Sequence, residues 1–117
     1  GQEPDGFVPV FRRIVILDSA KEEFKDIKKY VKRDFGDSVW NTVNAEYKGA
    51  LQRIKENPKI GSYVDELKEL GFTNVKYVLV RQTRVVYEFD DSLIIIHMFI
   101  GTRRDFRAHL LKRMFSQ

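Results

Sequence analysis

Two apolar stripes at helical spacing, separated by a single short turn, constrain most strongly how this chain can fold. Residues 19–35 and 38–57 each repeat large apolar side chains every three or four positions, which is the period of one helix face. Gly36 and Asp37 leave almost no loop between them, so the two helices should pack as an antiparallel hairpin. The stripes consist of Ala20, Phe24, Ile27 and Val31, and then Trp40, Val43, Tyr47, Ala50, Leu51 and Ile54.

Local signals predict where these helices begin and end. Ser19 and Glu22 have the spacing of a capping box, in which a hydroxyl and a carboxylate each satisfy an unpaired backbone amide. Gly36 should end the first helix in a left-handed conformation. Asn57-Pro58 should end the second, because proline disfavours helix in the residue before it.

Short runs rich in β-branched and apolar residues predict four strands. The last of them is nearly all apolar from Leu93 to His97, so we place it centrally in the sheet, with both faces covered. Turn-length connections join the last three strands, which predicts an antiparallel meander. One strand precedes the hairpin and three follow it: Phe11–Leu17, Val75–Val80, Arg84–Phe89 and Leu93–Ile100.

A short helical turn is expected at Tyr63–Leu70, ended by Gly71, and a last helix after Gly101, where Thr102 and Asp105 repeat the capping-box spacing. The order β-α-α-β-β-β-α predicts an α+β fold in which an antiparallel sheet is backed by the helical hairpin, with a C-terminal helix. The length fits one domain over residues 10–117. Residues 1–9 lack a signal-peptide pattern, and we interpret them as a leader or as residues added for expression.

Composition restricts the chemistry. The chain has no cysteine, which excludes disulfides, thiolate metal sites and cysteine nucleophiles and fits a reducing cytoplasm. No apolar run approaches the roughly 18 residues that span a bilayer, so we expect a cytoplasmic protein without a membrane partner. His97 and His109 are the only histidines and have no ligand cluster around them, so no metal is expected. His97 is interpreted as a satisfied sheet histidine, and the absence of phosphate-binding glycine patterns predicts no cofactor.

Basic residues gather toward the C-terminus. The segment from residue 103 to 117 carries five basic residues and one acidic residue, and so accounts for the whole net charge of +4. Arginines also flank the first turn of the meander. We expect these guanidinium groups to lie along one side of the sheet, where they would bind an anionic partner. The alternative is that they pair with the nearby acids and only solubilise the surface. The arginines are Arg81, Arg84, Arg103, Arg104 and Arg107, and the acids are Glu88, Asp90, Asp91 and Asp105.

Three stretches, in this order and spacing, resemble the RelE/ParE toxin superfamily. They are NPKIG at residues 57–61, LVRQTRVVYEF at 79–89 and IIIHMFIGTRRDF at 94–106. The resemblance extends over residues 12–115 and implies the toxin of a type II toxin–antitoxin module, which arrests bacterial growth. It also implies a cognate antitoxin whose C-terminal segment wraps the helices and sheet in a hetero-oligomer. Trp40 and Tyr47 are candidates for lining the antitoxin groove, with burial in the core as the alternative.

The superfamily contains two mechanisms, and the sequence favours one without excluding the other. ParE-type toxins poison DNA gyrase by binding it, and the two long hairpin helices resemble that branch. RelE-type toxins cleave mRNA on the ribosome, and Arg84 and Arg104 match two arginines of that branch. If the chain is an enzyme, it is such an RNA endonuclease.

The match to the nuclease branch is incomplete. Its two strand lysines would fall at Tyr77 and Leu79, and Lys76 should face the other way because side chains alternate along a strand. The tyrosine of its last helix would fall at Leu110, with His109 one residue away as an imperfect substitute. In either branch we expect target or nucleic-acid binding by Arg81, Arg103, Arg107, Lys112 and Arg113. A third possibility is a toxin-like remnant that does not arrest growth.

Overall fold

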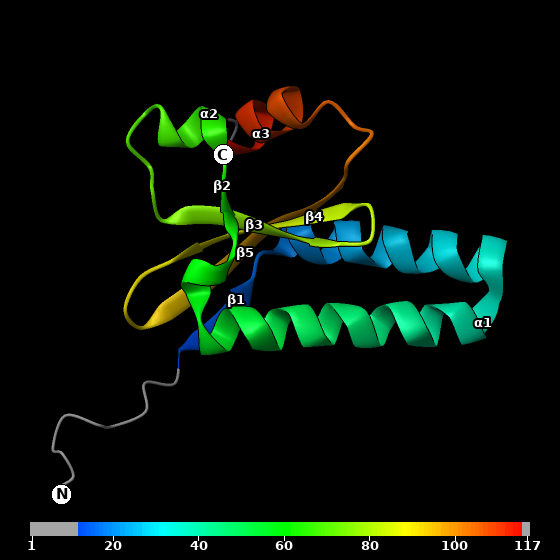
Figure 1. Cartoon of the computed structure of the whole chain (residues 1–117). Coiled ribbons are helices and arrows are strands. Elements are labelled where there is room, and N and C mark those ends of the chain that lie inside the picture. The colour runs from blue at the N-terminus through cyan, green and yellow to red at the C-terminus, as the bar shows by residue number, and fades with distance from the viewer. Residues whose placement is uncertain (1–11, 116–117) are drawn as a thin grey trace, which may run out of the picture.

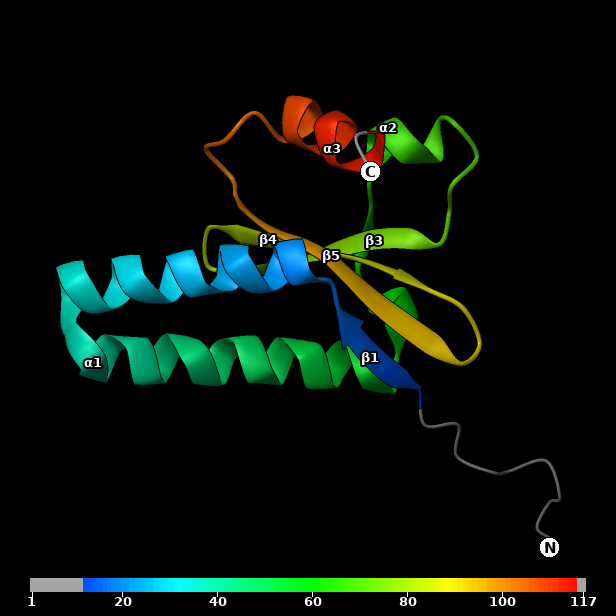
Figure 2. The same ribbon diagram turned by 180° about the vertical axis from the view of Figure 1, so that it is seen from behind.

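The computed structural model describes residues 12–115, with side chains described as far as Arg113. The leader interpretation of residues 1–9, and Phe11 of the first predicted strand, lie outside the described residues. The chain forms an α+β structure in which a long helical hairpin covers one face of a sheet and two shorter helices lie over the other (Figures 1 and 2). The elements are β1 (Arg13–Ile16), α1 (Asp18–Glu56), η1 (Pro58–Ile60), β2 (Ser62–Tyr63), α2 (Asp65–Lys68), β3 (Val75–Val80), β4 (Thr83–Phe89), β5 (Leu93–Gly101) and α3 (Phe106–Phe115).

The hairpin consists of two helices that meet at Gly36 within α1. Gly36 has φ 90° and ψ 171°, a conformation that residues with a side chain rarely adopt. Glycine therefore allows the chain to reverse within a single residue. The predicted helical hairpin is confirmed, and Gly36 has the expected positive φ with an extended rather than a left-handed helical ψ.

Both predicted capping boxes are wrong, because each helix begins at a different residue from the one expected. The first begins at Asp18, where the carbonyl of Leu17 accepts the amide of Lys21, so Ser19 already lies inside the first turn. The last begins at Phe106, and the Asp105 carboxylate accepts the amide of Ala108 at 3.0 Å. Asp105 is therefore the N-cap residue, in place of Thr102.

The strands form one mixed sheet in the order β1-β5-β4-β3-β2. The antiparallel meander of β3, β4 and β5 is confirmed, and β5 lies inside the sheet between β1 and β4, with β4 as the middle strand. β1 lies parallel to β5, and the two-residue strand β2, which the sequence analysis missed, pairs with β3 at the other edge. Gly71, with φ 94°, follows the short helical turn at α2 as expected.

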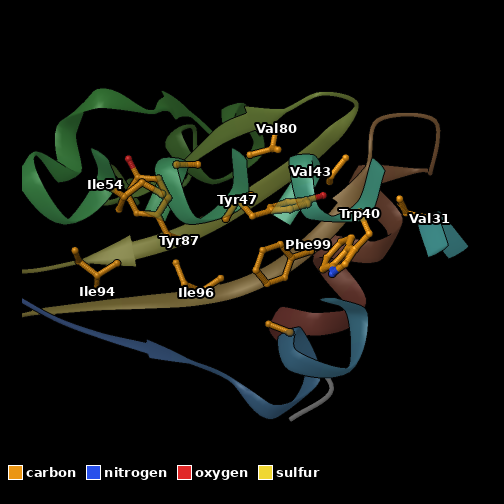
Figure 3. Packing of buried hydrophobic residues seen from close by; sticks show 13 residues of the cluster. Val31, Trp40, Val43, Tyr47, Ile54, Val80, Tyr87, Ile94, Ile96 and Phe99 are labelled. Carbon is orange, nitrogen blue, oxygen red and sulfur yellow. The ribbon is translucent and has the colours of Figure 1, made fainter. Parts of the chain in front are cut away.

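The sheet separates two apolar clusters. The larger lies between the sheet and the hairpin and contains Trp40, Tyr47 and Phe99 (Figure 3). The partly buried ring of Phe24 packs against it, 5.5 Å from Trp40 and 5.2 Å from both Tyr47 and Phe99. Burying each such large apolar side chain stabilises the fold by about 1.5–3 kcal/mol. The smaller cluster lies under α2 and α3 and consists of Val64, Leu67, Val75, Val86, Met98, Ile100 and Leu110.

A β-bulge at His97 changes which side chains of β5 face each of the two clusters. Val86 is opposite Met98 and Tyr87 is opposite Ile96, so His97 is an extra residue on β5. Beyond the bulge the alternation is reversed, and Met98 packs in the smaller cluster while Ile96 packs in the larger. His97 Nε2 lies 2.8 Å from Glu88 Oε1, which confirms the interpretation of a satisfied sheet histidine. None of the described helices is both long enough and apolar enough to span a bilayer.

Candidate functional site

The two arginines that flank the first turn of the meander lie on opposite faces of the sheet. Arg81 has φ 54° and donates two hydrogen bonds, from Nε at 2.8 Å and Nη2 at 2.9 Å, to the carboxylate of Glu46 in the hairpin. This contact lowers the pKa of Glu46, mainly through the hydrogen bond from Arg81. Arg84 points to the other face, where its guanidinium lies 4.6 Å from the Phe106 ring and 5.5 Å from the Tyr77 ring.

The expectation that the guanidinium groups share one side of the sheet is therefore wrong. Val80 and Thr83 close the turn as a pair, which leaves Arg81 inside the turn and Arg84 within β4. The positive φ of Arg81 brings its side chain to the hairpin, whereas strand alternation directs Arg84 toward α3. Arg84 Nε is buried and has no hydrogen-bond partner among the described residues.

Glu23 on the first helix of the hairpin is the centre of the most connected polar cluster in the site. Its Oε1 accepts the amide of Phe99 at 3.0 Å, and its Oε2 lies 3.0 Å from His109 Nε2 and 2.5 Å from Arg113 Nη1. Arg113 also donates to the carbonyl of His97. These contacts cover β5 beyond Ile96, where its pairing with β1 ends, and thereby protect an open strand edge.

This cluster gives two of the predicted site residues a structural role. His109 and Arg113 attach α3 to the hairpin through Glu23, whose side chain is only 20% exposed. Sequence reasoning missed Glu23 because its partners lie far along the chain. A signal was present: Glu23 is three residues after Ala20 and four before Ile27, so it borders the apolar stripe of its helix.

Arg104 and His109 both line a cleft of about 420 Å³ between the first hairpin helix and the end of β5. Glu23, Asp26 and Tyr30 line the same cleft, so acidic and basic groups are mixed there. Arg84 does not line it. The other predicted basic residues, Arg103, Arg107 and Lys112, lie exposed on α3 and the loop before it.

Trp40 and Tyr47, the two candidates for antitoxin contact, are 4% and 3% exposed and belong to the core. Burial is the main cause of the raised pKa of Tyr47. An apolar groove of about 370 Å³ lies beside them between the two hairpin helices, and Tyr47 lines it while Trp40 does not. The aliphatic and aromatic lining includes Ile16, Phe24 and Leu51, and the lysines Lys21, Lys25 and Lys48 also line it.

Three of the positions that distinguish the nuclease branch have structural roles here, whereas Leu79 is 53% exposed. Lys76 faces the hairpin side, as strand alternation predicts, and is buried with Nζ 3.2 Å from the carbonyl of Gly61 and 3.7 Å from the Tyr63 ring centre. Tyr77 packs with Arg84 on the opposite face. Leu110 is fully buried in the smaller cluster.

The NPKIG stretch also contributes to packing. Tyr87 donates its hydroxyl proton to the carbonyl of Pro58 at 2.6 Å and accepts the amide of Gly61 at 3.1 Å. A Cβ on Gly61 would lie only 2.6 Å from the Tyr87 hydroxyl oxygen and 2.8 Å from the carbonyl oxygen of Tyr77. The motif therefore joins the end of the hairpin to the sheet.

Comparison with known proteins identifies a family. A family model described as the ParE toxin of the type II toxin–antitoxin system parDE matches residues 14–106, which include the hairpin, β2 to β5 and all of β1 except Arg13. No curated protein matches the chain.

Proposed function

Because the chain belongs to the ParE toxin family of type II toxin–antitoxin systems, we propose that it arrests bacterial growth by binding and poisoning DNA gyrase. We further propose that it acts in the cytoplasm and that a cognate antitoxin neutralises it in a hetero-oligomer. No cofactor or metal takes part in this mechanism, since a poison that acts by binding needs neither.

The dispersal of the candidate catalytic groups is the observation that carries this proposal. Cleavage of a phosphodiester needs a proton-transferring group and a cation within reach of the same phosphate. Arg84 lies against two aromatic rings on the α3 face and does not line the cleft that Arg104 and His109 share, and His109 is engaged there by Glu23. This distribution supports a protein that acts through its surface rather than through an assembled nuclease site.

A supercoiling assay tests the proposal. The pure protein should inhibit supercoiling by gyrase at micromolar concentration and should stabilise cleaved DNA. Addition of the product of the neighbouring gene, if it is the antitoxin, should restore supercoiling. Undisturbed supercoiling at micromolar concentration contradicts gyrase poisoning.

A ribosome-dependent mRNA endonuclease is the second candidate, and one observation favours it: Arg104 and His109 line the same cleft. This function predicts new 5′ ends on translated mRNA in primer-extension experiments, and their loss in Arg104→Ala. Intact transcripts in cells that the toxin has arrested contradict it. Normal growth on expression contradicts both functions and supports an inactive remnant.

The lysine-lined apolar groove between the hairpin helices is our proposed contact for the antitoxin. Its apolar floor suits the apolar face of an amphipathic segment, and Lys21, Lys25 and Lys48 suit acidic residues on that segment. Trp40 would then support the groove from beneath rather than contact the antitoxin. Lys25→Glu combined with Lys48→Glu should weaken antitoxin binding, and an unchanged affinity contradicts this assignment.

A further inference from the structure

The far end of the hairpin projects past the β3–β4 turn, clear of the rest of the sheet, in both views of the molecule (Figures 1 and 2). Three large apolar side chains are exposed there, on either side of Gly36. Tyr30 is 50% exposed, Phe35 58% and Val39 37%, and we call these three residues the tip patch. The rings of Tyr30 and Phe35 meet edge to face with their centres 6.0 Å apart, so the patch is a continuous surface.

The tip patch continues into a second hollow and then into the Arg104 cleft. An apolar cavity of about 260 Å³ lies between the hairpin helices and the β3–β4 turn, and all three patch residues line it. Ile27, Tyr30 and Thr83 line both this cavity and the 420 Å³ cleft that contains Arg104 and His109. The two hollows therefore adjoin along these three residues, the one at the hairpin end being mainly apolar and the one at the α3 end charged.

The patch lies outside the cluster that joins hairpin and sheet, and exposed apolar surface of this kind commonly marks an interaction site. Gly36 permits the chain to reverse there within one residue, and Lys32 lies 3.8 Å from Asp37 across the reversal.

The charge beside the patch indicates the chemistry of its partner. Lys32 and Arg33 are paired with Asp37 and Asp34. Lys28, Lys29 and Asp26 are exposed on this helix and belong to none of the ion pairs within residues 12–115, so two basic groups stand against one acidic group there and the local charge is positive. The surface therefore matches an apolar socket edged by carboxylates, because such a socket would cover the aromatic rings and neutralise the two lysines.

We propose that the toxin binds its protein target through the tip patch and the adjoining cavity of about 260 Å³. The target presents an apolar socket with an acidic rim. This inference rests on the proposed function, because it assumes a protein target, and it assigns target and antitoxin to different parts of the hairpin. The antitoxin groove lies toward the base, at Ile16, Phe24 and Leu51, and the tip patch lies at the other end.

The test compares two double variants of the full chain. Tyr30→Ala with Phe35→Ala removes the rings of the tip patch. Leu70→Ala with Phe72→Ala is the matched control, because these side chains are 63% and 48% exposed but lie in the segment after α2. The tip variant should raise the concentration that half-inhibits gyrase supercoiling by about tenfold or more, as expected for aromatic anchors. The control variant should leave it unchanged, and Lys28→Glu with Lys29→Glu should raise it to a smaller extent.

Three further measurements test whether the tip patch binds the target, the antitoxin or a second copy of the chain. Thermal melting must show that the tip variant stays folded, and calorimetry should show an antitoxin affinity within about twofold of the wild type. A parallel loss of antitoxin affinity overturns the proposal in favour of an antitoxin contact. Sedimentation of a dimer that the tip variant converts to a monomer overturns it in favour of a second copy of the chain.

Failure of the proposed function and failure of this inference give different results. If the wild-type toxin inhibits gyrase and the tip variant is equally potent, the inference is wrong and the function stands. If the wild-type toxin does not inhibit supercoiling by gyrase but does arrest growth, the assignment of gyrase as the target is wrong. The same variants are then compared by growth arrest, where equal toxicity of tip variant and wild type overturns the inference and selective loss in the tip variant supports it.

Discussion

The hydroxyl of Tyr87 connects the centre of the sheet to the segment that ends the hairpin, through its bonds with Pro58 and Gly61. Tyr87→Phe keeps the ring in place but leaves the carbonyl of Pro58 and the amide of Gly61 without this partner. Leaving one buried polar group unpaired costs about 1–3 kcal/mol, and of these two contacts only the one to Pro58 is fully buried, so we expect the free energy of unfolding to fall by an amount in that range. Urea denaturation measures the change, and wild-type stability in the variant contradicts this role for the hydroxyl.

A matched pair of glycine substitutions tests the close packing at the NPKIG motif. In Gly61→Ala the new methyl group would collide with the Tyr87 hydroxyl and the Tyr77 carbonyl, so the variant should lose about 1–3 kcal/mol of stability. In Gly49→Ala the nearest atom is the flexible end of Arg53, 3.6 Å away, and the helix should gain up to about 1 kcal/mol. Equal melting temperatures for the two variants would show that the motif tolerates a side chain.

Single residues also show where sequence reasoning about the site was limited. The sequence reveals that Arg81 and Arg84 flank a turn, but their directions depend on which of them lies inside it. The positive φ of Arg81 and the Val80–Thr83 pair send the two side chains to opposite faces. Lys76 was placed correctly, because it lies within a regular strand where alternation applies.

At the scale of elements, α3 is held to the hairpin by Glu23. Glu23→Ala removes the acceptor for Phe99 and leaves Arg113 and His109 without their shared carboxylate. We expect a loss of about 2–3 kcal/mol, below the range for a fully buried pair because Glu23 is partly exposed. Amide hydrogen exchange in α3 should accelerate at the same time.

Glu22→Ala provides the control for that experiment. Glu22 pairs with Lys25 at 3.2 Å, but both side chains are 69% exposed. Exposed pairs of this kind contribute about 0–1 kcal/mol, so the control should stay close to the wild type. If both variants lose the same stability, or if α3 keeps its protection in Glu23→Ala, Glu23 does not attach the helix.

Most elements could be predicted from the sequence because their signals are local. The apolar stripes give the hairpin, and β3, β4 and β5 match the predicted strands to within a residue at each end. The parallel pairing of β1 with β5 could not be predicted from local signals, because the paired residues are about 80 positions apart in the sequence. β2 was missed because two residues, Ser62 and Tyr63, carry no periodic pattern.

For the molecule as a whole, buried phenols predict a loss of stability in alkali. Burial raises the pKa of both Tyr47 and Tyr87 above the ordinary value, chiefly through desolvation. Their contribution to stability is fully present below a pH of about 10, where the unfolded phenols begin to ionise, and is lost as the pH rises through the folded pKa values.

Urea denaturation at a series of pH values from neutral to strongly alkaline measures this effect. Each phenol should contribute a decrease of up to about 1.4 kcal/mol per pH unit in the affected range. Tyr87→Phe should start from a lower stability but decline less steeply with pH than the wild type. Parallel curves for the two proteins contradict the assignment of the alkaline loss to Tyr87.

The parallel pairing of β1 with β5 has a consequence for the nascent chain. β1 is synthesised before the hairpin, yet its sheet partner, residues 93–96, follows it by about 80 residues. The hairpin can form early from local interactions, whereas the sheet that packs against it is complete only after β5 has been synthesised. A ribosome that stalls before β5 therefore holds a chain in which β1 has no strand to pair with.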